Sequence, residues 1–212
     1  KEIMVFLHAH GVSTNLAVKI YKEYGDTSLQ VVQENPYQLE RDIYGIGFKT
    51  ADRIAQALGL SPEHPSRIEA GIVFALNETI NQGHVYVPNG MLVQRAIELL
   101  EVSHELLQPG LERLEGQERV RQEKLPRPNG RDDEIIDVVY LAPLYWGEVG
   151  VAERIKALTK AQSPLLLQEE LPQTGLELSD EQGQAVRMAL EHPVSILTGG
   201  PGTGKTTCLK AL

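Results

Sequence analysis

The sharpest chemical motif of the 212-residue chain lies near its C-terminal end. Residues 199–206 read GGPGTGKT and fit the pattern G-x-x-x-x-G-K-[ST]. Glycines in such a loop let backbone N–H groups turn inward around phosphate oxygens, and the following helix directs its positive end at the same anion. Lys205 is expected to reach the β- and γ-phosphates, while the Thr206 hydroxyl completes the coordination of Mg²⁺.

A glutamine upstream of this loop has two compatible interpretations. Residues 179–182 (SDEQ) form a capping box, so Gln182 can cap the helix that begins there. Its side chain can also contact an adenine base. We therefore expect ATP and Mg²⁺ as cofactors, with Lys205 and Thr206 as the catalytic pair and Thr206 as the metal-coordinating residue. The predicted ATP-binding residues are Gln182, Gly199, Gly200, Pro201, Gly202, Thr203, Gly204, Lys205, Thr206 and Thr207.

A second chemical signal is an internal repeat at a spacing of 34 residues, which pairs residues 11–13 (GVS) with residues 45–47 (GIG). The second copy resembles the helix-hairpin-helix motif of DNA-binding proteins. In that motif the glycines allow a tight turn, the apolar residue between them is buried, and backbone N–H groups bind a DNA phosphate. The predicted DNA-binding residues are Gly11, Val12, Ser13, Gly45, Ile46, Gly47, Lys49 and Thr50.

Alternatives remain open at both hairpins and at one basic stretch. Ser13 replaces the second glycine of the first copy, so Ser13 or Thr14 could instead cap the following helix. Both hairpins could also serve packing alone. The basic stretch is either a solvated strand and loop or a DNA-facing wing, and it contains Arg119, Arg121, Lys124, Arg127 and Arg131.

The elements that must position these residues are mostly helical. Apolar periodicity predicts five short helices in two hairpins over residues 1–59. Further helices are expected at 67–82, 91–100, 106–114, 145–161, 179–191 and 207–212, and strands at 85–87, 118–125, 135–141 and 194–198, the last of them buried. The fold class is therefore mainly α with small β elements.

Four segments follow from this order of elements. A tandem helix-hairpin-helix domain is expected at 1–62, and a helical, winged-helix-like unit at 63–128. A strand-helix connector and linker would occupy 129–175, and the truncated start of a RecA-like α/β P-loop domain would occupy 176–212.

Composition limits the classes of protein that fit. The single cysteine excludes a disulfide framework, and neither a membrane span nor a signal peptide is found, so we expect a cytoplasmic protein without a membrane partner. The net charge is −9, yet residues 1–59 carry 6 basic and 7 acidic side chains. This charge balance excludes a large basic surface that binds DNA electrostatically, but it permits short-range contacts to backbone phosphates.

Together the motifs resemble the middle of a long-form RecD-like (RecD/TraA type) bacterial DNA helicase of superfamily 1. The resemblance implies a motor that uses ATP to move 5′→3′ along single-stranded DNA and unwind duplexes, with a RecA-like core beginning near residue 176. It places the nucleotide-loop glycine, lysine and threonine on Gly204, Lys205 and Thr206, and the adenine-reading glutamine on Gln182. The matching stretches are NPYQL (35–39), GIGFKTADRIA (45–55), SRIEAGI (66–72), GHVYVP (83–88), LSDEQGQAVRMAL (178–190) and LTGGPGTGKTT (197–207).

The resemblance also suggests that the sequence is an internal fragment, because it begins at Lys1 without a methionine and ends at Leu212 just after the loop. Hydrolysis needs an acidic Mg²⁺ ligand, a water-positioning group and an arginine, and none can be assigned. We therefore expect the fragment alone to be inactive, and expect its partner to be single-stranded or forked DNA in repair or recombination. The alternatives are a non-catalytic adaptor, whose hairpins bind DNA or a partner beside another P-loop ATPase, and a repair scaffold of the helix-hairpin-helix type.

Overall fold

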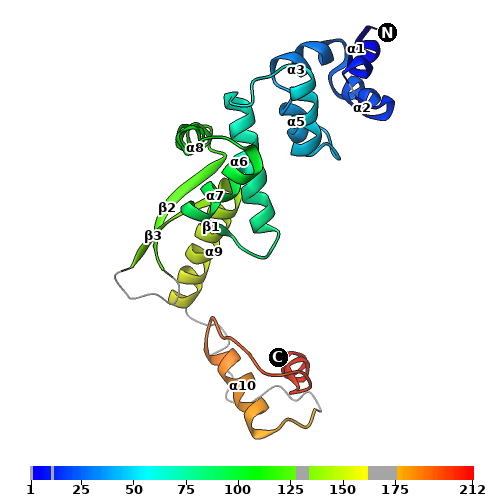
Figure 1. Cartoon of the computed structure of the whole chain (residues 1–212). Coiled ribbons are helices and arrows are strands. Elements are labelled where there is room, and N and C mark those ends of the chain that lie inside the picture. The colour runs from blue at the N-terminus through cyan, green and yellow to red at the C-terminus, as the bar shows by residue number, and fades with distance from the viewer. Residues whose placement is uncertain (1, 11, 128–133, 162–175) are drawn as a thin grey trace. The chain divides into compact units, whose positions relative to one another are not determined.

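The computed structural model describes residues 2–10, 12–127, 134–161 and 176–212, and the chain divides into two compact units, residues 1–145 and 146–212 (Figure 1). Gly11, Arg131 and most of the expected linker lie outside the described residues. Each unit is described by itself below.

The first unit begins with the five short helices that the sequence predicts. Apolar residues of both repeats are buried in a common core, among them Ala17 and Ile20 of the first copy and Ala51 and Ile54 of the second. This equivalence explains the 34-residue spacing, since each copy contributes the same helix face to the core. The helices are α1 (Glu2–Ala9), α2 (Thr14–Tyr24), α3 (Ser28–Glu34), α4 (Gln38–Asp42) and α5 (Phe48–Ala57), with a 3₁₀ turn at Gly25–Thr27.

A second group of elements follows in the order helix, strand, helix, helix, strand, strand. These are α6 (Pro65–Ile80), β1 (Tyr86–Pro88), α7 (Asn89–Leu100), α8 (Leu107–Gly116) after a 3₁₀ turn at His104–Leu106, β2 (Val120–Pro126) and β3 (Ile135–Leu141). The three strands form an antiparallel sheet in the order β1-β3-β2 (Figure 1). This order and connectivity are those of a winged-helix unit, which confirms that part of the expected fold class.

The expected boundary at residue 128 divides this sheet and needs correction. A connector is expected over 129–175, whereas β3, which lies in that range, is the central strand of the sheet. Val87 of β1 is opposite Val139 of β3, and Val120 of β2 is opposite Leu141 of β3. Since β1 and β2 do not pair with each other, both depend on β3 for their hydrogen bonds. The winged-helix unit therefore extends through β3.

A buried ionic network joins the hairpin helices to this unit. Arg67 at the start of α6 donates from Nε to Asp52 Oδ1 of α5 at 2.8 Å, and from Nη1 to the carbonyls of Pro62 and Leu100 at 3.0 and 2.9 Å. The Tyr37 hydroxyl donates to the same Asp52 oxygen at 2.6 Å. A charge this buried requires full pairing, so the network fixes α5 against α6 and the end of α7.

The second unit has a small buried core in the parts of it that the structure describes, residues 146–161 and 176–212. It holds most of α9 (Ala142–Lys160), then α10 (Asp180–Glu191) and α11 (Lys205–Lys210). Its small core consists of Val186, Leu190, Cys208 and Ala211. Among the described helices of the whole chain, none is both long and apolar enough to cross a membrane.

The strand predicted at 194–198 is absent from this unit, so that prediction is wrong. The segment forms neither strand nor helix, and Ile196 is 83% exposed. A strand is held by hydrogen bonds to a neighbour, and residues 176–212 contain no other strand that could pair with it.

Candidate phosphate-binding sites

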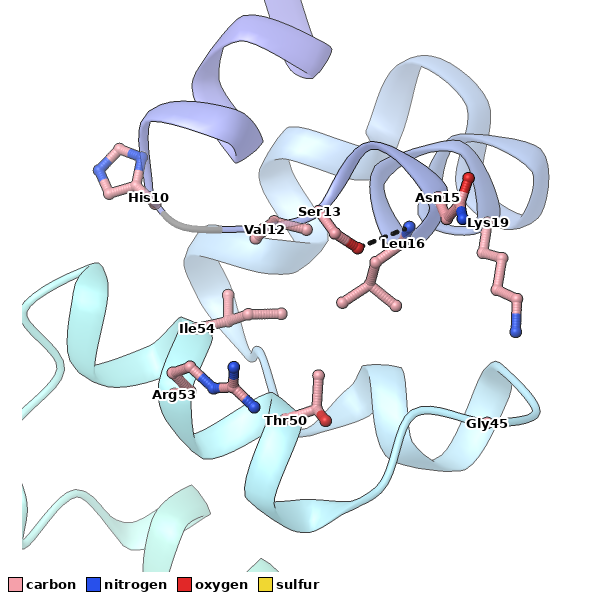
Figure 2. Close-up of a pocket in the computed structure, with 10 residues that line it drawn as sticks. All are labelled: His10, Val12, Ser13, Asn15, Leu16, Lys19, Gly45, Thr50, Arg53 and Ile54. Carbon is pink, nitrogen blue, oxygen red and sulfur yellow. Dashed lines mark hydrogen bonds between the residues drawn. The ribbon is translucent and has the colours of Figure 1, made fainter.

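A cavity of about 330 Å³ lies between the two hairpins of the first unit (Figure 2). Its walls come from the start of α2 and from the hairpin and first turns of α5. The lining residues are His10, Val12, Ser13, Asn15, Leu16, Lys19, Gly45, Thr50, Arg53 and Ile54. The structure thus brings both copies of the repeat, which the sequence predicts to form one tandem domain, to one shared cavity.

Local backbone chemistry shapes both sides of this cavity. Ser13 is the N-cap of α2, and its hydroxyl accepts the N–H of Leu16 at 3.4 Å, which is the alternative role left open for it. Gly45 has φ = +89°, a conformation that favours glycine. A Cβ at this position would lie 3.2 Å from Lys19 Nζ, which donates to the Tyr44 carbonyl at 3.2 Å. Lys19 of the first copy is therefore held over the hairpin of the second.

The charge of the cavity is positive. Lys19 and Arg53 contribute cations from opposite sides of it (Figure 2), and no carboxylate is found among its ten described lining residues. His10 adds a third titratable base, with its Nδ1–H donating to the Phe6 carbonyl at 2.8 Å. A cavity whose described lining holds two cations and no carboxylate is suited to an anion.

Lys19 and Arg53 were missed by sequence reasoning, yet a signal for them existed. They are separated by 34 residues, the spacing of the repeat, so they are equivalent positions in the two copies. A comparison of the copies position by position would have paired these two basic residues.

The other predicted DNA-binding residues fall into three groups. Val12, Ser13, Gly45 and Thr50 line the cavity. Ile46 is 3% exposed and anchors the second hairpin, and Gly47 is the N-cap of α5. Gly11 lies outside the described residues.

Lys49 is directed away from the cavity. Its Nζ lies 5.7 Å from the centroid of the Phe74 ring in α6, and Lys49 is not among the lining residues. This geometry is a cation–π contact within the first unit. The charge that the sequence analysis assigned to Lys49 is supplied in this cavity by Lys19 and Arg53.

The basic stretch on β2 is largely neutralised by carboxylates. Three of its side chains form ion pairs: Arg121 with Glu115 at 3.8 Å, Lys124 with Asp137 at 4.0 Å and Arg127 with Glu134 at 3.0 Å. These exposed pairs favour the interpretation of a solvated strand over that of a DNA-facing wing.

The glycine-rich loop of the second unit holds its lysine internally. Lys205 Nζ donates to the carbonyls of Gly199 and Gly200 at 2.7 and 2.6 Å, and Thr203 Oγ1 donates to the Gly200 carbonyl at 2.9 Å. Gly204 has φ = +82° immediately before α11. The ammonium group is thus positioned inside the loop by neutral acceptors, and phosphate oxygens could replace them.

Gln182 connects α10 to this loop. The capping box is present, with Gln182 Oε1 accepting the N–H of Ser179 at 3.0 Å. Its Nε2 donates to the Thr203 carbonyl at 3.3 Å. One side chain therefore caps the helix and contacts the phosphate-binding loop at the same time.

The residues of the loop suit a nucleotide better than an independently bound metal. Within the described ranges, no group of three or more His, Cys, Asp and Glu side chains could hold a metal ion. Thr206 is exposed at the start of α11 and offers a single hydroxyl. Mg²⁺ would therefore arrive with the nucleotide phosphates, and Thr206 would provide one ligand.

Comparisons with known proteins agree with this arrangement. Residues 1–86 match a family model described as the ATP-dependent RecD2 DNA helicase HHH domain, and residues 182–212 match a model described as an AAA domain. The ATP-dependent RecD2 DNA helicase of Deinococcus radiodurans is 27% identical over 227 aligned positions. The alignment covers 100% of this chain and 30% of that relative, so the chain spans about a third of its length. The resemblance to RecD-like helicases predicted from the motifs is confirmed.

Proposed function

We propose that this chain, as a relative of the RecD-like superfamily 1 helicases, is part of an ATP-dependent DNA helicase that moves 5′→3′. The observation that carries the proposal is the pairing, within one chain, of an acid-free cationic cavity between two hairpins and a lysine-bearing phosphate loop. In this proposal the first site holds DNA and the second binds ATP with Mg²⁺. DNA repair and recombination are the processes in which such an activity would serve.

The hairpin cavity would hold a phosphate of the DNA backbone. Lys19 and Arg53 supply charge, and the Thr50 hydroxyl and the first N–H groups of α2 and α5 supply short-range hydrogen bonds. None of these groups reads a base edge, so binding would be independent of sequence, and single-stranded or forked DNA is the proposed partner. Only two cations contribute here, so the dependence of affinity on salt would be shallow.

When a nucleotide binds, the loop would replace hydrogen bonds between its own residues with hydrogen bonds to the phosphates. Lys205 Nζ would hold β- and γ-phosphate oxygens in place of the carbonyls of Gly199 and Gly200, and Thr206 would provide a ligand for Mg²⁺. Gln182 already touches the loop through Thr203, so an adenine contact by this residue would couple base recognition to the position of the loop.

The DNA-binding part of the proposal is tested by fluorescence anisotropy with labelled single-stranded, duplex and forked DNA at two salt concentrations. Lys19→Ala and Arg53→Ala should each weaken binding by about threefold to tenfold, or ~0.6–1.4 kcal/mol. Lys22→Ala is the matched control, because Lys22 is exposed on the same helix and does not line the cavity. Unchanged affinity in both cavity variants would remove the DNA role from this site.

The adaptor alternative predicts a different pattern. If the hairpins bind a partner protein instead of DNA, the affinity of the unaltered chain for all three DNA forms should be undetectable. ATP binding at the second site should then be retained.

A further inference from the structure

A second cavity of about 600 Å³ lies between the hairpin helices and the winged-helix unit. It is bounded by α4 and the turn before it, by the first turns of α6, and by the segment from α8 to β2. Its lining includes two arginines and two carboxylates as well as neutral polar side chains, and the ones that matter here are Asn35, Glu40, Arg41, Ser66, Glu69 and Arg119. All of them belong to the first unit, and none is shared with the cavity between the hairpins.

Two arginines face this cavity without a partner. Neither Arg41 nor Arg119 forms an ion pair or hydrogen bond through its side chain with any described residue. Arg119 is half-buried, and burial lowers the pKa of its guanidinium, with the positive charge of Arg41 lowering it further. Both guanidiniums line the same cavity, and like charges in one cavity are unfavourable unless a group of opposite charge lies beside them.

The two carboxylates of the cavity, Glu40 and Glu69, only partly balance the positive charge of the arginines. Glu69 is already bound by Arg113 Nε at 2.6 Å and by Gln117 Nε2 at 3.1 Å. Burial raises the pKa of Glu40, and the positive charges of Arg119 and Arg41 partly offset this effect. Both carboxylates attract Arg119, yet neither contributes a hydrogen bond to it.

Neutral donors complete the lining. Asn35 lines the cavity, and because its Oδ1 accepts the N–H of Tyr37 at 3.2 Å, its amide NH₂ is the group that can donate to a ligand. The Ser66 hydroxyl lies on the α6 side of the cavity. Guanidinium groups bind tetrahedral oxyanions in a bidentate manner, and amide and hydroxyl donors extend the same pattern.

We propose that this cavity is a phosphate-binding site in which Arg41 and Arg119 hold the anion between them, supported by Asn35 and Ser66. The anion screens the repulsion between the two guanidiniums and gives each of them a hydrogen-bond acceptor. The site is separate from the hairpin cavity and from the nucleotide loop, and it does not depend on the function proposed for either. Its phosphate is either a backbone phosphate of a DNA strand or that of a small free phosphate compound.

The proposal is tested by titrating the whole 212-residue chain with inorganic pyrophosphate. The Lys205→Ala background silences the nucleotide loop. Side-chain Nε–Hε signals of the arginines, assigned by substitution, are followed by NMR. The signals of Arg41 and Arg119 should shift and saturate, and Arg41→Gln or Arg119→Gln should weaken the affinity about tenfold. Arg154→Gln, at an exposed position of α9, is the matched control and should change nothing.

The stability of the same variants separates binding from a structural role. Removing one of two mutually repelling charges should leave the melting temperature without ligand unchanged or raised. The ability of pyrophosphate to raise the melting temperature should be lost. A lower melting temperature in both variants, with pyrophosphate stabilisation retained, would mean that the arginines serve the fold, and the proposal would fail.

A single-stranded oligonucleotide distinguishes the two sources of phosphate. If DNA shifts the Arg41 and Arg119 signals and pyrophosphate competes with it, the site holds backbone phosphates. If pyrophosphate alone shifts them, the site holds a free phosphate compound. If neither pyrophosphate nor DNA shifts the Arg41 and Arg119 signals, the proposal is overturned. Loss of DNA affinity in the Lys19→Ala variant tests the hairpin cavity and has no bearing on this site.

Discussion

At the scale of single residues, Glu40 gives a prediction about pH. Burial raises the pKa of its carboxyl, so the folded chain holds this proton more tightly than the unfolded chain does. The contribution of Glu40 to the free energy of unfolding is therefore fully present below its ordinary pKa of 4.5. It is lost as the pH rises through the raised pKa, because the folded chain then has to hold a buried negative charge. We expect Glu40→Gln to raise the melting temperature at about pH 7 and to have no effect at about pH 3.5.

The matched control for Glu40 is Glu98→Gln. Glu98 is an exposed carboxylate on α7 that accepts a hydrogen bond from Gln94 at 2.7 Å. It should show no such pH-dependent gain. If Glu40→Gln lowered the melting temperature at about pH 7, attraction of the carboxylate to the arginines would outweigh the cost of its burial, and the prediction would be wrong.

Lys205 gives the second prediction at this scale. Its ammonium binds only neutral carbonyls in the loop, so Lys205→Ala should leave the fold of the second unit intact. Binding of a fluorescent ATP analogue should weaken about tenfold or more, because a charge-assisted contact to phosphate contributes ~1.5–3 kcal/mol. Lys210→Ala in the same short helix is the control, and equal loss of affinity in both variants would show that only general charge matters.

At the scale of elements, two glycines of the first unit predict opposite effects of the same substitution. Gly71 lies inside α6, and a Cβ there would meet the Leu100 side chain of α7 at 2.5 to 2.8 Å. Leu100 is 2% exposed and cannot move aside. Gly71→Ala should therefore destabilise the unit by about 1–3 kcal/mol in urea unfolding.

Gly90 is the control for this packing prediction. It lies in the first turn of α7, and a Cβ at this position would meet nothing within 4 Å. Gly90→Ala should therefore stabilise the unit by ~0.5–1 kcal/mol, because alanine loses less backbone conformational entropy on folding than glycine does. A stabilised Gly71→Ala protein would show that α6 and α7 pack less closely than described.

The elements also show where sequence reasoning succeeds. Helical periodicity depends only on the face that a segment buries, so the five hairpin helices and the capping box at Ser179 were predicted correctly. Strand 135–141 was located correctly from its apolar, β-branched composition, but its place at the centre of the sheet was not predicted. Pairing depends on which other strands are near, and that information is not local.

The candidate sites follow the same division. The loop at 199–206 was identified because all its chemistry lies in consecutive residues. The hairpin cavity was found only in part, since Lys19 reaches it from one copy and Arg53 from the other. Segment 194–198 failed as a strand because an apolar composition alone provides no hydrogen-bonding partner.

At the scale of the whole molecule, the two units differ greatly in their buried cores. One continuous cluster runs from Leu7 through the hairpin helices and the winged-helix unit to Val139. In the described part of the second unit, four buried residues form a separate cluster. Because stability follows the apolar surface removed from water, amides of α6 and α7 should be far better protected from hydrogen exchange than those of α10 and α11.

Arg67 tests whether the first unit acts as one body. Its side chain is 8% exposed and that of Asp52 is 13% exposed, so removing Arg67 leaves a largely buried carboxylate with neutral donors but without its cation. Arg67→Ala should lower the free energy of unfolding by about 3–5 kcal/mol.

Hydrogen exchange shows how far this loss spreads. Because Arg67 joins α5, α6 and the end of α7, the amides of the hairpin helices and of the winged-helix unit should lose protection together, while those of α10 and α11 stay unchanged. Arg127→Ala, which breaks an exposed pair with Glu134, should cost at most ~1 kcal/mol. Loss of protection confined to the hairpin helices would show that they fold separately, and that the ionic network only joins two independent domains.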